Sequence, residues 1–322
     1  MNVLITGGAG YLGSTLAGHL LDNGYSVTVL DNLLYKQLSL LHLFKHDRFN
    51  FVKGDVRDKD LVVRLASTHD VVIPLAAIVG MPACKENPDL AIAVNYEQIK
   101  TIVDVLRDDQ KLIIPNTNSQ YGSSPDIITE ESPFKPLSLY AQTKCGAEDY
   151  VLKNSNGVVL RLATVFGASP RMRQDLLVND FTYKAVTDGY LVLFEGHFKR
   201  NYIHVQDIAR TFQFMIENYD RCNGEVYNVG LSSANLSKLE LAQRIKDYIP
   251  KLVIVEDNFS KDFDQRNYIV SNNKIETLGW TANFSLDYGI KQLINAYQLI
   301  TTVNNRNFTN RSEEHTSELQ SH

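Results

Sequence analysis

NVLITGGAGYLG, residues 2–13, is the stretch that decides the fold. The apolar run at residues 3–5 predicts a short buried strand, and Gly7, Gly10 and Gly13 follow it at three-residue steps. Apolar residues then recur at helical spacing, so a helix is expected directly after the glycines. A strand, a glycine-rich turn and a helix in this order predict a dinucleotide-binding site.

Each glycine has a separate role in this hypothesis. Gly7 permits the tight turn, Gly10 lets backbone N–H groups approach a pyrophosphate, and Gly13 lets the helix pack closely on the strand. The N-terminus of the helix adds partial positive charge, which favours a bound phosphate.

An acidic residue follows the next predicted strand. Asp31 lies 18 residues after Gly13, where a carboxylate accepts hydrogen bonds from the adenosine ribose and repels a 2′-phosphate. NAD is therefore favoured over NADP, and the alternative for Asp31 is a turn or helix N-cap aspartate. Asp55 follows the third predicted strand, where adenine is expected, but it could equally cap a helix that begins near Asp58.

The composition is that of a soluble protein with a sizeable core: 322 residues, 44% hydrophobic, 21% charged, with a net charge of −5. No apolar run approaches the roughly 20 residues that span a bilayer, and the first residues enter a strand instead of a signal peptide. Cys84, Cys145 and Cys222 are widely spaced, which argues against a disulfide framework or a metal site and for a reducing cytoplasm. Without a basic run, nucleic acid is not an expected partner.

The last twelve residues differ in character from the rest of the chain. Residues 311–322, RSEEHTSELQSH, have no hydrophobic periodicity and match the translation of a common sequencing adapter. We interpret them as read-through, with the natural chain ending or truncated near Asn310. A disordered polar tail is the alternative, and neither version carries function.

The first half of the chain alternates predicted strands and helices. Parallel strands need crossover helices, so this alternation predicts an α/β fold with a doubly wound parallel sheet. The expected strands are residues 26–30, 49–53, 71–75, 111–114 and 157–162, and the main helices are residues 89–106 and 139–152.

From Gly167 the alternation loosens. We expect helices at residues 175–187, 205–218, 237–248 and 286–300, and short strands near Leu191, Tyr202, Leu252 and Tyr268. The resulting division is a Rossmann domain over residues 1–167, rejoined by about 201–230, a smaller mixed α/β substrate domain over residues 168–302, and a tail from residue 303.

The chemistry is expected from Thr117, Tyr140 and Lys144. Tyr140 and Lys144 are four residues apart and so share one face of a helix. A lysine ammonium near a phenol favours the phenolate and lowers the tyrosine pKa from about 10. Tyr140 could then accept a proton from a sugar hydroxyl while hydride leaves the same carbon for nicotinamide. Lys144 would also hold the nicotinamide ribose, and Thr117 would hydrogen-bond the reacting hydroxyl.

With these residues in place, the chain resembles the extended short-chain dehydrogenase/reductases of the sugar-nucleotide epimerase/dehydratase family. The resemblance extends from residue 1 to about 296. It rests on TGGAGYLG (6–13), LAA (75–77), NTNSQYG (116–122), YAQTK (140–144) and RNYIHVQDIA (200–209). It implies bound NAD(H), a Tyr/Lys/Thr catalytic set, and a C-terminal domain that binds a nucleoside diphosphate sugar. We also expect a cytoplasmic homodimer.

The resemblance implies cofactor contacts from the strand-end turns and the catalytic helix. The expected contacts are Gly7, Gly10, Tyr11, Leu12, Gly13, Asp31, Asn32, Asp55, Val56, Leu75, Ala76, Ala77, Asn95, Tyr140 and Lys144. Asn95 matches the start of an Asn-x-x-Gly-Thr helix motif of the family, although Gln98 replaces its glycine.

Substrate contacts are expected from both halves of the chain. They are Asn118, Ser119, Arg171, Arg173, Asn179, Arg200 and Arg266. Asn179, Arg200 and Arg266 match family positions near the nucleotide, and two arginines suit a diphosphate because they combine charge with bidentate geometry. Solvated surface arginine is the alternative for Arg200 and Arg266. Arg171 and Arg173 lie in a loop that faces either the sugar or the solvent.

Some positions depart from the family pattern. Asn118 and Ser119 occupy the slots where dehydratases of the family carry Asp-Glu, so a 4,6-dehydratase is disfavoured. Asn201 stands for the usual aspartate, and Thr164 replaces an asparagine that often touches the diphosphate.

Three functions are considered. Residues 116–122, 161–181, 226–238 and 264–280 are similar to bacterial GDP-D-glycero-α-D-manno-heptose 4-dehydrogenases within the family, which favours NAD-dependent oxidation at C4 to a 4-keto sugar nucleotide. A 4-epimerase needs the same three residues and stays open. A non-catalytic nucleotide-binding scaffold is the remote alternative, because such proteins usually lose the tyrosine or the lysine.

Overall fold

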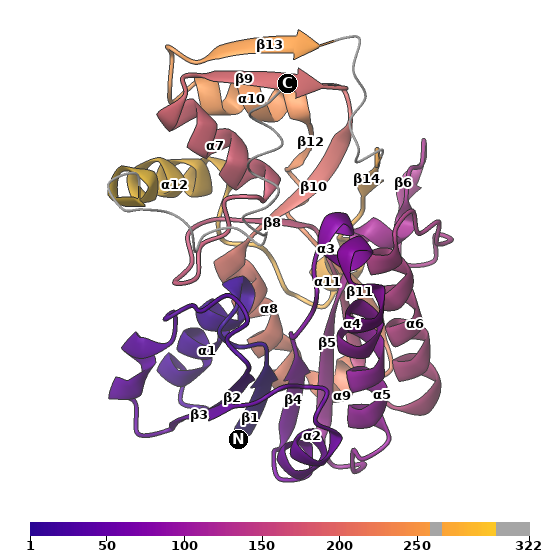
Figure 1. The fold of residues 1–322 in the computed structure, drawn as a ribbon. Coiled ribbons are helices and arrows are strands. Elements are labelled where there is room, and N and C mark those ends of the chain that lie inside the picture. Colours follow the sequence, from indigo (N-terminus) through magenta and orange to yellow (C-terminus); the bar gives the residue numbers. More distant parts are fainter. Residues whose placement is uncertain (258–265, 301–322) are drawn as a thin grey trace.

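The protein has a larger lobe built on one parallel sheet and a smaller lobe that sits over the C-terminal ends of its strands (Figure 1). The computed structural model describes residues 1–257 and 266–300. The segment interpreted as adapter read-through, residues 311–322, lies outside the described residues.

Seven strands form the sheet of the larger lobe, in the order β11-β7-β5-β4-β1-β2-β3. All neighbours pair in parallel, which confirms the predicted doubly wound α/β fold. The strands are β1 (Asn2–Thr6), β2 (Ser26–Asp31), β3 (Phe49–Lys53), β4 (Val71–Pro74), β5 (Lys111–Thr117), β7 (Val158–Leu162) and β11 (Val226–Val229). The strand β11 was not among the expected strands, and β5 extends three residues further than predicted.

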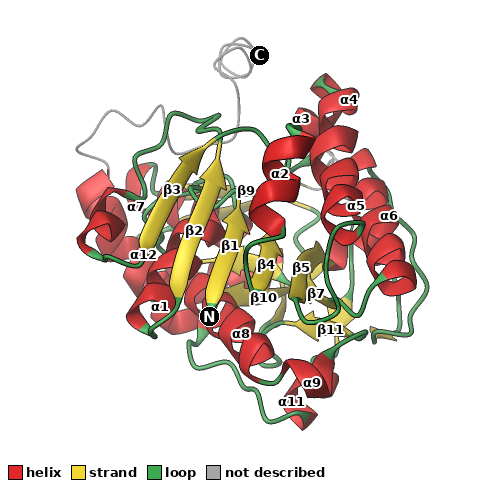
Figure 2. Ribbon diagram, turned by 90° about the horizontal axis from the view of Figure 1, so that it is seen from below, coloured by secondary structure: helices red, strands yellow, loops and turns green. Residues whose placement is uncertain are grey.

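Helices cover both faces of this sheet (Figure 2). On one face, α1 (Tyr11–Asp22) packs against α8 (Val205–Glu217), and their apolar side chains join one buried cluster with β1 and β2. On the other face lie α2 (Lys59–Ala66), α5 (Gln98–Val103) and α6 (Leu139–Asn154), whose apolar residues form a second cluster. Two short helices complete this part of the lobe: α11 (Asn273–Thr277) packs against β11, and α9 (Tyr219–Cys222) packs against α8.

One predicted helix is wrong as a single element. Residues 89–106 form α4 (Pro88–Ile92), the π-helical turn η2 (Ala93–Glu97) and then α5, preceded by the unpredicted α3 (Met81–Glu86). A π-helical turn widens the helix by one residue per turn. It contains Asn95, whose amide is hydrogen-bonded to the backbone of Ile78.

The order of the strands places a crevice between β1 and β4. From β1 the chain builds outward through β2 and β3 on one side, and through β4, β5, β7 and β11 on the other. In such sheets ligands bind at this point, outside the carboxyl ends of the strands. The glycine turn, the turn after β4 and the end of β5 therefore share one edge.

The smaller lobe has its own buried cluster. Its helices are α7 (Leu177–Thr187), α10 (Lys238–Lys246) and α12 (Leu286–Ile300), and its strands are β8 (Thr164–Phe166), β9 (Tyr190–Phe194), β10 (Lys199–His204), β12 (Asn235–Ser237) and β13 (Val253–Asp257). A further parallel pair, β6 (Ile127–Ile128) with β14 (Ile269–Val270), joins a loop after β5 to the C-terminal part of the chain.

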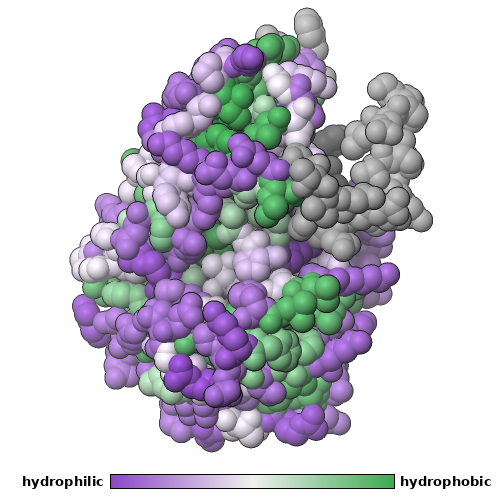
Figure 3. Space-filling model, turned by 90° about the vertical axis from the view of Figure 1, so that its left-hand side faces the viewer, coloured by the Kyte–Doolittle hydropathy of each residue, from purple (hydrophilic) through white to green (hydrophobic). Residues whose placement is uncertain are grey.

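Hydrophilic residues dominate the surface shown in Figure 3, and hydrophobic side chains gather in separate areas of the upper and lower parts of that face. Within residues 1–257 and 266–300, no helix has both the length and the apolar character needed to cross a bilayer.

Candidate active site

Two glycines of the turn after β1 occupy positions that exclude a side chain. Gly7 has φ +70°, and a Cβ on it would lie 2.5 Å from the backbone N of Ala76. A Cβ on Gly13 would lie 2.5 Å from the Cα of Gly8, so α1 packs directly on the turn. These contacts agree with the tight turn and the close helix packing expected from the sequence.

The N-terminus of α1 fits a dinucleotide pyrophosphate. Gly10 is its N-cap, no side chain caps it, and its first turn carries no acidic residue. The backbone N–H groups of the first turn, Tyr11 to Gly13, therefore lack the usual side-chain acceptor and suit an anion.

Asp31 is fixed at the end of β2 by two backbone hydrogen bonds. The N–H of Ala9 donates to Oδ2 at 2.9 Å, and the N–H of Leu33 donates to Oδ1 at 2.7 Å. The side chain is 8% exposed, and burial raises the pKa of its carboxyl although Arg171 and these hydrogen bonds oppose the shift. The contact with Leu33 is the aspartate turn of the alternative interpretation, while each oxygen keeps a lone pair for a ribose hydroxyl.

We expect NAD to bind at least about 100-fold more tightly than NADP, because a 2′-phosphate beside the buried Asp31 carboxylate places like charges together at low effective dielectric. Calorimetric titration of the purified protein with both cofactors measures the ratio. The variant Asp31→Asn keeps the shape but removes the charge, so it should narrow the ratio. Equal dissociation constants for wild type would contradict the assignment of Asp31.

The carboxylate of the second acidic residue, Asp55, accepts hydrogen bonds from neighbouring side chains. Arg57 donates to both carboxylate oxygens at 2.9 Å, and Asn32 donates to Oδ2 at 3.0 Å. These hydrogen bonds hold the pKa of Asp55 well below its usual range. The alternative that Asp55 caps α2 is wrong, because Asp58 is the N-cap and accepts from the N–H of Leu61.

The turn after β4, residues 75–77, is held to the end of β1. The N–H of Leu75 donates to the carbonyl of Thr6 at 2.9 Å. Gln98 donates to the carbonyl of Ala76 at 2.6 Å and accepts from the Thr6 hydroxyl at 3.2 Å. Gln98, which replaces a family glycine, is thus a supporting residue that the sequence did not reveal. The side-chain amide of Asn95 is likewise hydrogen-bonded to the backbone N–H and carbonyl of Ile78.

The helix α6 carries the predicted Tyr140 and Lys144. Ser138 caps it by accepting from the N–H of Ala141 at 3.2 Å, which places Tyr140 in the first turn and Lys144 one turn later. Lys144 is 5% exposed. Asn116, at the end of β5, donates to the carbonyl of Lys144 at 3.2 Å and so ties this helix to the strand that carries Thr117, the threonine predicted to be catalytic.

Thr117 is the last residue of β5 and begins a chain of hydroxyl groups. Its Oγ1 donates to Ser119 Oγ at 3.0 Å and accepts from the N–H of Ser119 at 3.1 Å. Arg266, from beyond β13, donates to the same Ser119 hydroxyl. Thr117 and Ser119 belong to β5 and the 3₁₀ turn η3 (Asn118–Tyr121), so the two halves of the chain meet at the predicted reaction site.

The electrostatics around Tyr140 differ from the expectation. Burial raises the pKa of Tyr140 to about 12, and the positive charges that oppose this shift belong to Arg173 and Arg266, with no contribution from Lys144 among the described residues. Burial lowers the pKa of Lys144 to about 8, while Glu148 raises it. The Tyr140 pKa is therefore raised, and the lowering expected from Lys144 is wrong.

Of the predicted substrate residues, Asn179 is buried and Arg173 is half-buried. Arg173 pairs with Asp175, its Nε donating at 3.1 Å. Asn179 accepts from the N–H of Gly167 at 3.1 Å and donates to the carbonyl of Arg173 at 2.8 Å. Tyr11, from the glycine turn, donates its hydroxyl to the carbonyl of Gly167 at 2.6 Å. This junction couples the cofactor turn to the smaller lobe.

The alternative of surface placement is wrong for Arg171 and Arg200. Arg171 is 3% exposed and lies over the ring of Tyr35 at 4.9 Å, on the loop after β2. Arg200 is also buried, donates to the carbonyl of Lys199 at 2.9 Å and lies 5.5 Å from the ring of Tyr268.

Asn118 stands out among the buried polar residues. It is 1% exposed, and within the described part of the chain neither its amide nitrogen nor its amide oxygen has a hydrogen-bond partner. It directly follows Thr117. A buried amide without partners is costly, so this side chain is a good candidate for contact with a ligand.

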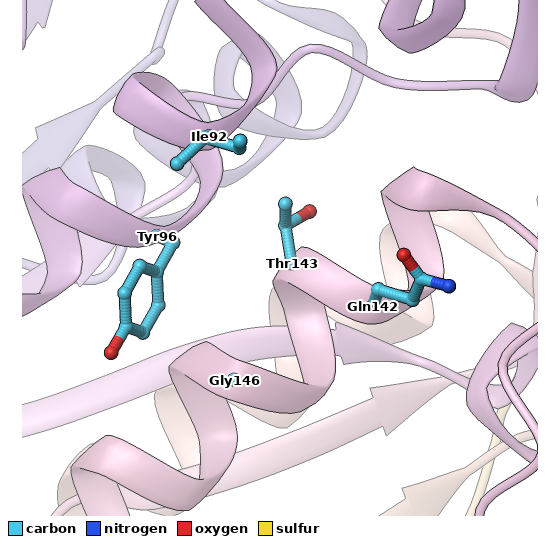
Figure 4. Close-up of a pocket in the computed structure, with 5 residues that line it drawn as sticks. All are labelled: Ile92, Tyr96, Gln142, Thr143 and Gly146. Atoms are coloured by element: carbon cyan, nitrogen blue, oxygen red, sulfur yellow. The ribbon is translucent and has the colours of Figure 1, made fainter. Parts of the chain in front are cut away.

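A cavity of ≈ 240 Å³ lies between α6 and the segment that contains α4 and η2 (Figure 4). It is lined by Ile92, Tyr96, Gln142, Thr143 and Gly146. None of these belongs to the predicted catalytic set, so this cavity is not where the sequence places the chemistry.

Comparisons with known proteins agree with a dinucleotide-binding site at this edge of the sheet. A sequence model described as the NAD dependent epimerase/dehydratase family matches residues 3–230. The chain belongs to this family. Its cofactor is NAD, and it is an NAD-dependent enzyme of the sugar-nucleotide epimerase/dehydratase type.

Relatives of this epimerase/dehydratase chain carry several activities. It is 30% identical to the low-salt glycan biosynthesis protein Agl12 of Haloferax volcanii, over 92% of this chain and 98% of the relative. It is 27% identical to a putative UDP-glucose 4-epimerase of Methanocaldococcus jannaschii, over 91% and 97%. The structure of UDP-glucuronic acid 4-epimerase from Bacillus cereus, in complex with UDP-glucuronic acid and NAD, matches with a TM-score of 0.83 at 26% identity, over 93% and 100%.

Other supporting residues of this family member were missed in the sequence. Ser169 donates to the carbonyl of Tyr11 at 2.6 Å and so holds the loop after β8 against the glycine turn. Glu148 lies one turn beyond Lys144 and contacts Asn116. Glu148 had a signal, because Tyr140, Lys144 and Glu148 follow one another at steps of four residues. Ser169 had none.

Proposed function

We propose that the protein oxidises C4 of a nucleoside diphosphate sugar, a GDP-manno-heptose, to a 4-keto sugar nucleotide used as a polysaccharide precursor. The observation that supports the reaction type is the link between α6, which carries Tyr140 and Lys144, and the end of β5, which carries Thr117: Asn116 donates to the carbonyl of Lys144. Arg266 donates to Ser119, two residues after Thr117. The similarity of residues 161–181 and 264–280 to heptose 4-dehydrogenases supports the choice of substrate.

In this proposal each residue has a separate role in the oxidation of an alcohol. NAD, when bound, supplies the hydride acceptor. Thr117 and Ser119 orient the reacting hydroxyl, and Tyr140 accepts its proton. Lys144 holds the nicotinamide ribose. Arg173 and Arg266 favour the phenolate of Tyr140, because both lower its pKa against the effect of burial.

The substrate contacts come from both lobes. Arg200 and Arg266 bind the diphosphate, Asn179 supports the nucleotide, and Asn118 uses its unpaired amide on the sugar. Asn118 and Ser119 cannot replace a carboxylic acid as proton donor, so elimination to a 4,6-dehydrated product is not expected. We further propose a homodimer in the cytoplasm.

A 4-epimerase is the second candidate. Relatives named as 4-epimerases favour it, including the putative UDP-glucose 4-epimerase of Methanocaldococcus jannaschii and the Bacillus cereus enzyme. An epimerase returns the hydride to the other face of the 4-keto sugar, so it ends each cycle with NAD⁺ and needs no outside oxidant.

The two candidates differ in electron balance, which a single experiment measures. The purified protein, loaded with NAD⁺, is incubated with a panel of nucleotide sugars, and the products are followed by mass spectrometry with absorbance at the NADH band. For a 4-dehydrogenase we expect at most about one 4-keto product per active site, one burst of NADH, and renewed turnover when an oxidant is added.

Continuous interconversion of C4 epimers without lasting NADH would overturn the dehydrogenase proposal in favour of the epimerase. Reaction with a uridine or thymidine sugar but not with a guanosine heptose would overturn the substrate. If the nucleotide sugars bind but none is converted to a product, the result would favour the non-catalytic nucleotide-binding scaffold.

A further inference from the structure

A buried ion pair joins α6 to β7, one helical turn after Lys144. Glu148 of α6 is 2% exposed, and Arg161 of β7 donates to both of its oxygens through Nε, at 3.1 and 3.2 Å, and to Oε1 through Nη2. The other end of Arg161 is fixed as well, because Nη1 donates to the hydroxyl of Tyr121 at 2.6 Å and to the carbonyl of Glu130 at 2.8 Å. The guanidinium also lies over the ring of Phe134 at 4.5 Å.

The carboxylate of this pair also reaches the catalytic strand. Asn116 donates to Glu148 Oε2 at 2.6 Å, and Gln120 donates to the same oxygen at 2.9 Å. Asn116 in turn donates to the carbonyl of Lys144 and accepts from the N–H of Thr117 at 2.9 Å. Glu148 is therefore one residue removed from the backbones of both Thr117 and Lys144.

We propose that Glu148 is a positioning residue of the catalytic set, which holds the Thr117 end of β5 and the Lys144 turn of α6 in register through Asn116. A carboxylate that accepts hydrogen bonds from three side chains on β5, η3 and β7 fixes these elements relative to α6. This proposal rests on the proposed function, because the residues it positions are those assigned to turnover.

Glu148 also acts on the charge of Lys144. Burial alone disfavours the ammonium, and among the described residues the Glu148 carboxylate is the charge that raises the Lys144 pKa. Arg161, from β7, is neutralised by Glu148 itself, and Arg173 and Arg266, from the smaller lobe, act on Tyr140. Removing the carboxylate therefore lowers the pKa of Lys144 below about 8, and the lysine loses its proton at a lower pH.

The test measures the Lys144 pKa without any sugar substrate. The NAD-free protein is trace-labelled with acetic anhydride across a pH series, and acetylation of Lys144 is quantified by mass spectrometry. For Glu148→Gln we expect the midpoint to fall by about 1 pH unit, the lower end of the effect of a nearby opposite charge. Glu148→Asp should keep the wild-type midpoint. Asp149→Asn, the next residue, is the control, because Asp149 pairs with Lys153 at the surface.

Turnover provides the second readout. Activity that needs protonated Lys144 declines as the pH rises through the Lys144 pKa, so the alkaline limb of the kcat profile should move to lower pH in Glu148→Gln by the same amount. If no sugar reacts with wild type, the proposed function fails while the labelling result still decides the role of Glu148. An unchanged Lys144 midpoint in a folded Glu148→Gln protein would overturn the positioning proposal.

Loss of the carboxylate leaves Arg161 buried without its partner, which can prevent folding. The variant that combines Glu148→Gln with Arg161→Met removes both charges and is expected to fold. Its Lys144 midpoint should still lie below the wild-type value, but it should fall less than in Glu148→Gln, because the positive charge of Arg161 is also gone. Should this variant also fail to fold, Glu148→Asp decides. It keeps the charge but withdraws the carboxylate from Asn116, so kcat should fall at least about 10-fold with an unchanged alkaline limb, and wild-type kcat would overturn the proposal.

Discussion

The variant Tyr140→Phe should lose nearly all turnover, with kcat lowered by about 10²–10⁴-fold, which is the usual contribution of proton transfer by a positioned side chain. Phenylalanine keeps the ring and its packing on α6 but cannot accept the proton of the reacting hydroxyl. NAD should stay bound, since the other expected cofactor contacts, Lys144 included, are unchanged. Single-turnover absorbance at the NADH band and calorimetry with NAD measure the two effects separately.

Two further variants serve as comparisons for Tyr140→Phe. Tyr150→Phe removes a hydroxyl from the same helix, where the phenol donates to Asp104 at 2.6 Å at the surface, and should leave kcat unchanged. Lys144→Ala should impair both turnover and NAD binding, because Lys144 is assigned to the nicotinamide ribose. If Tyr140→Phe retained more than about a tenth of wild-type kcat, another group would have to be the proton acceptor.

The variant Gly13→Ala should destabilise the protein and weaken NAD binding at least about 10-fold, which corresponds to about 1.4 kcal/mol. The added Cβ would meet the Cα of Gly8 at 2.5 Å and the carbonyl oxygen of Gly7 at 2.7 Å, and neither backbone atom can rotate away. Overpacking of this kind costs typically 1–3 kcal/mol. α1 must then move away from the turn, and the N–H groups that face the pyrophosphate move with it.

The same substitution elsewhere on α1 is the matched control. In Gly18→Ala the Cβ would lie 3.5 Å from Leu43 Cδ2 and 3.9 Å from His42 Nε2, which are ordinary contacts. Because alanine is the better helix former by about 0.8–1 kcal/mol, Gly18→Ala should raise the melting temperature. Thermal unfolding and calorimetry on both variants give the comparison, and equal effects would show that the close packing at Gly13 is unimportant.

Local spacing made much of the fold predictable from the sequence. The strand, turn and helix around Gly7 and Gly13 lie within a dozen consecutive residues, and Tyr140 and Lys144 lie within one helical turn, so backbone geometry alone brings them together. Alternation of strands and helices gave the parallel sheet for the same reason. The prediction of one helix at residues 89–106 was wrong, because the π-helical turn there depends on the hydrogen bond between Asn95 and Ile78. The spacing of apolar residues does not specify that contact.

Contacts between distant parts of the chain came only from the tertiary structure. Arg266 reaches Ser119 across 147 positions because β14 pairs with β6, and no local pattern predicts that pairing. The position of Glu148 on the catalytic helix could be predicted from its spacing, but its partner Arg161 lies on β7.

The sequence by itself determined the dinucleotide turn, the parallel α/β fold and the Tyr140–Lys144 pair on one helix face. Tertiary structure alone decided which charges act on these groups, placing Arg173 and Arg266 near Tyr140 and Glu148 behind Lys144. The physical reason is that a pKa depends on burial and on the charges packed around a group, and both are set by elements far apart in the sequence.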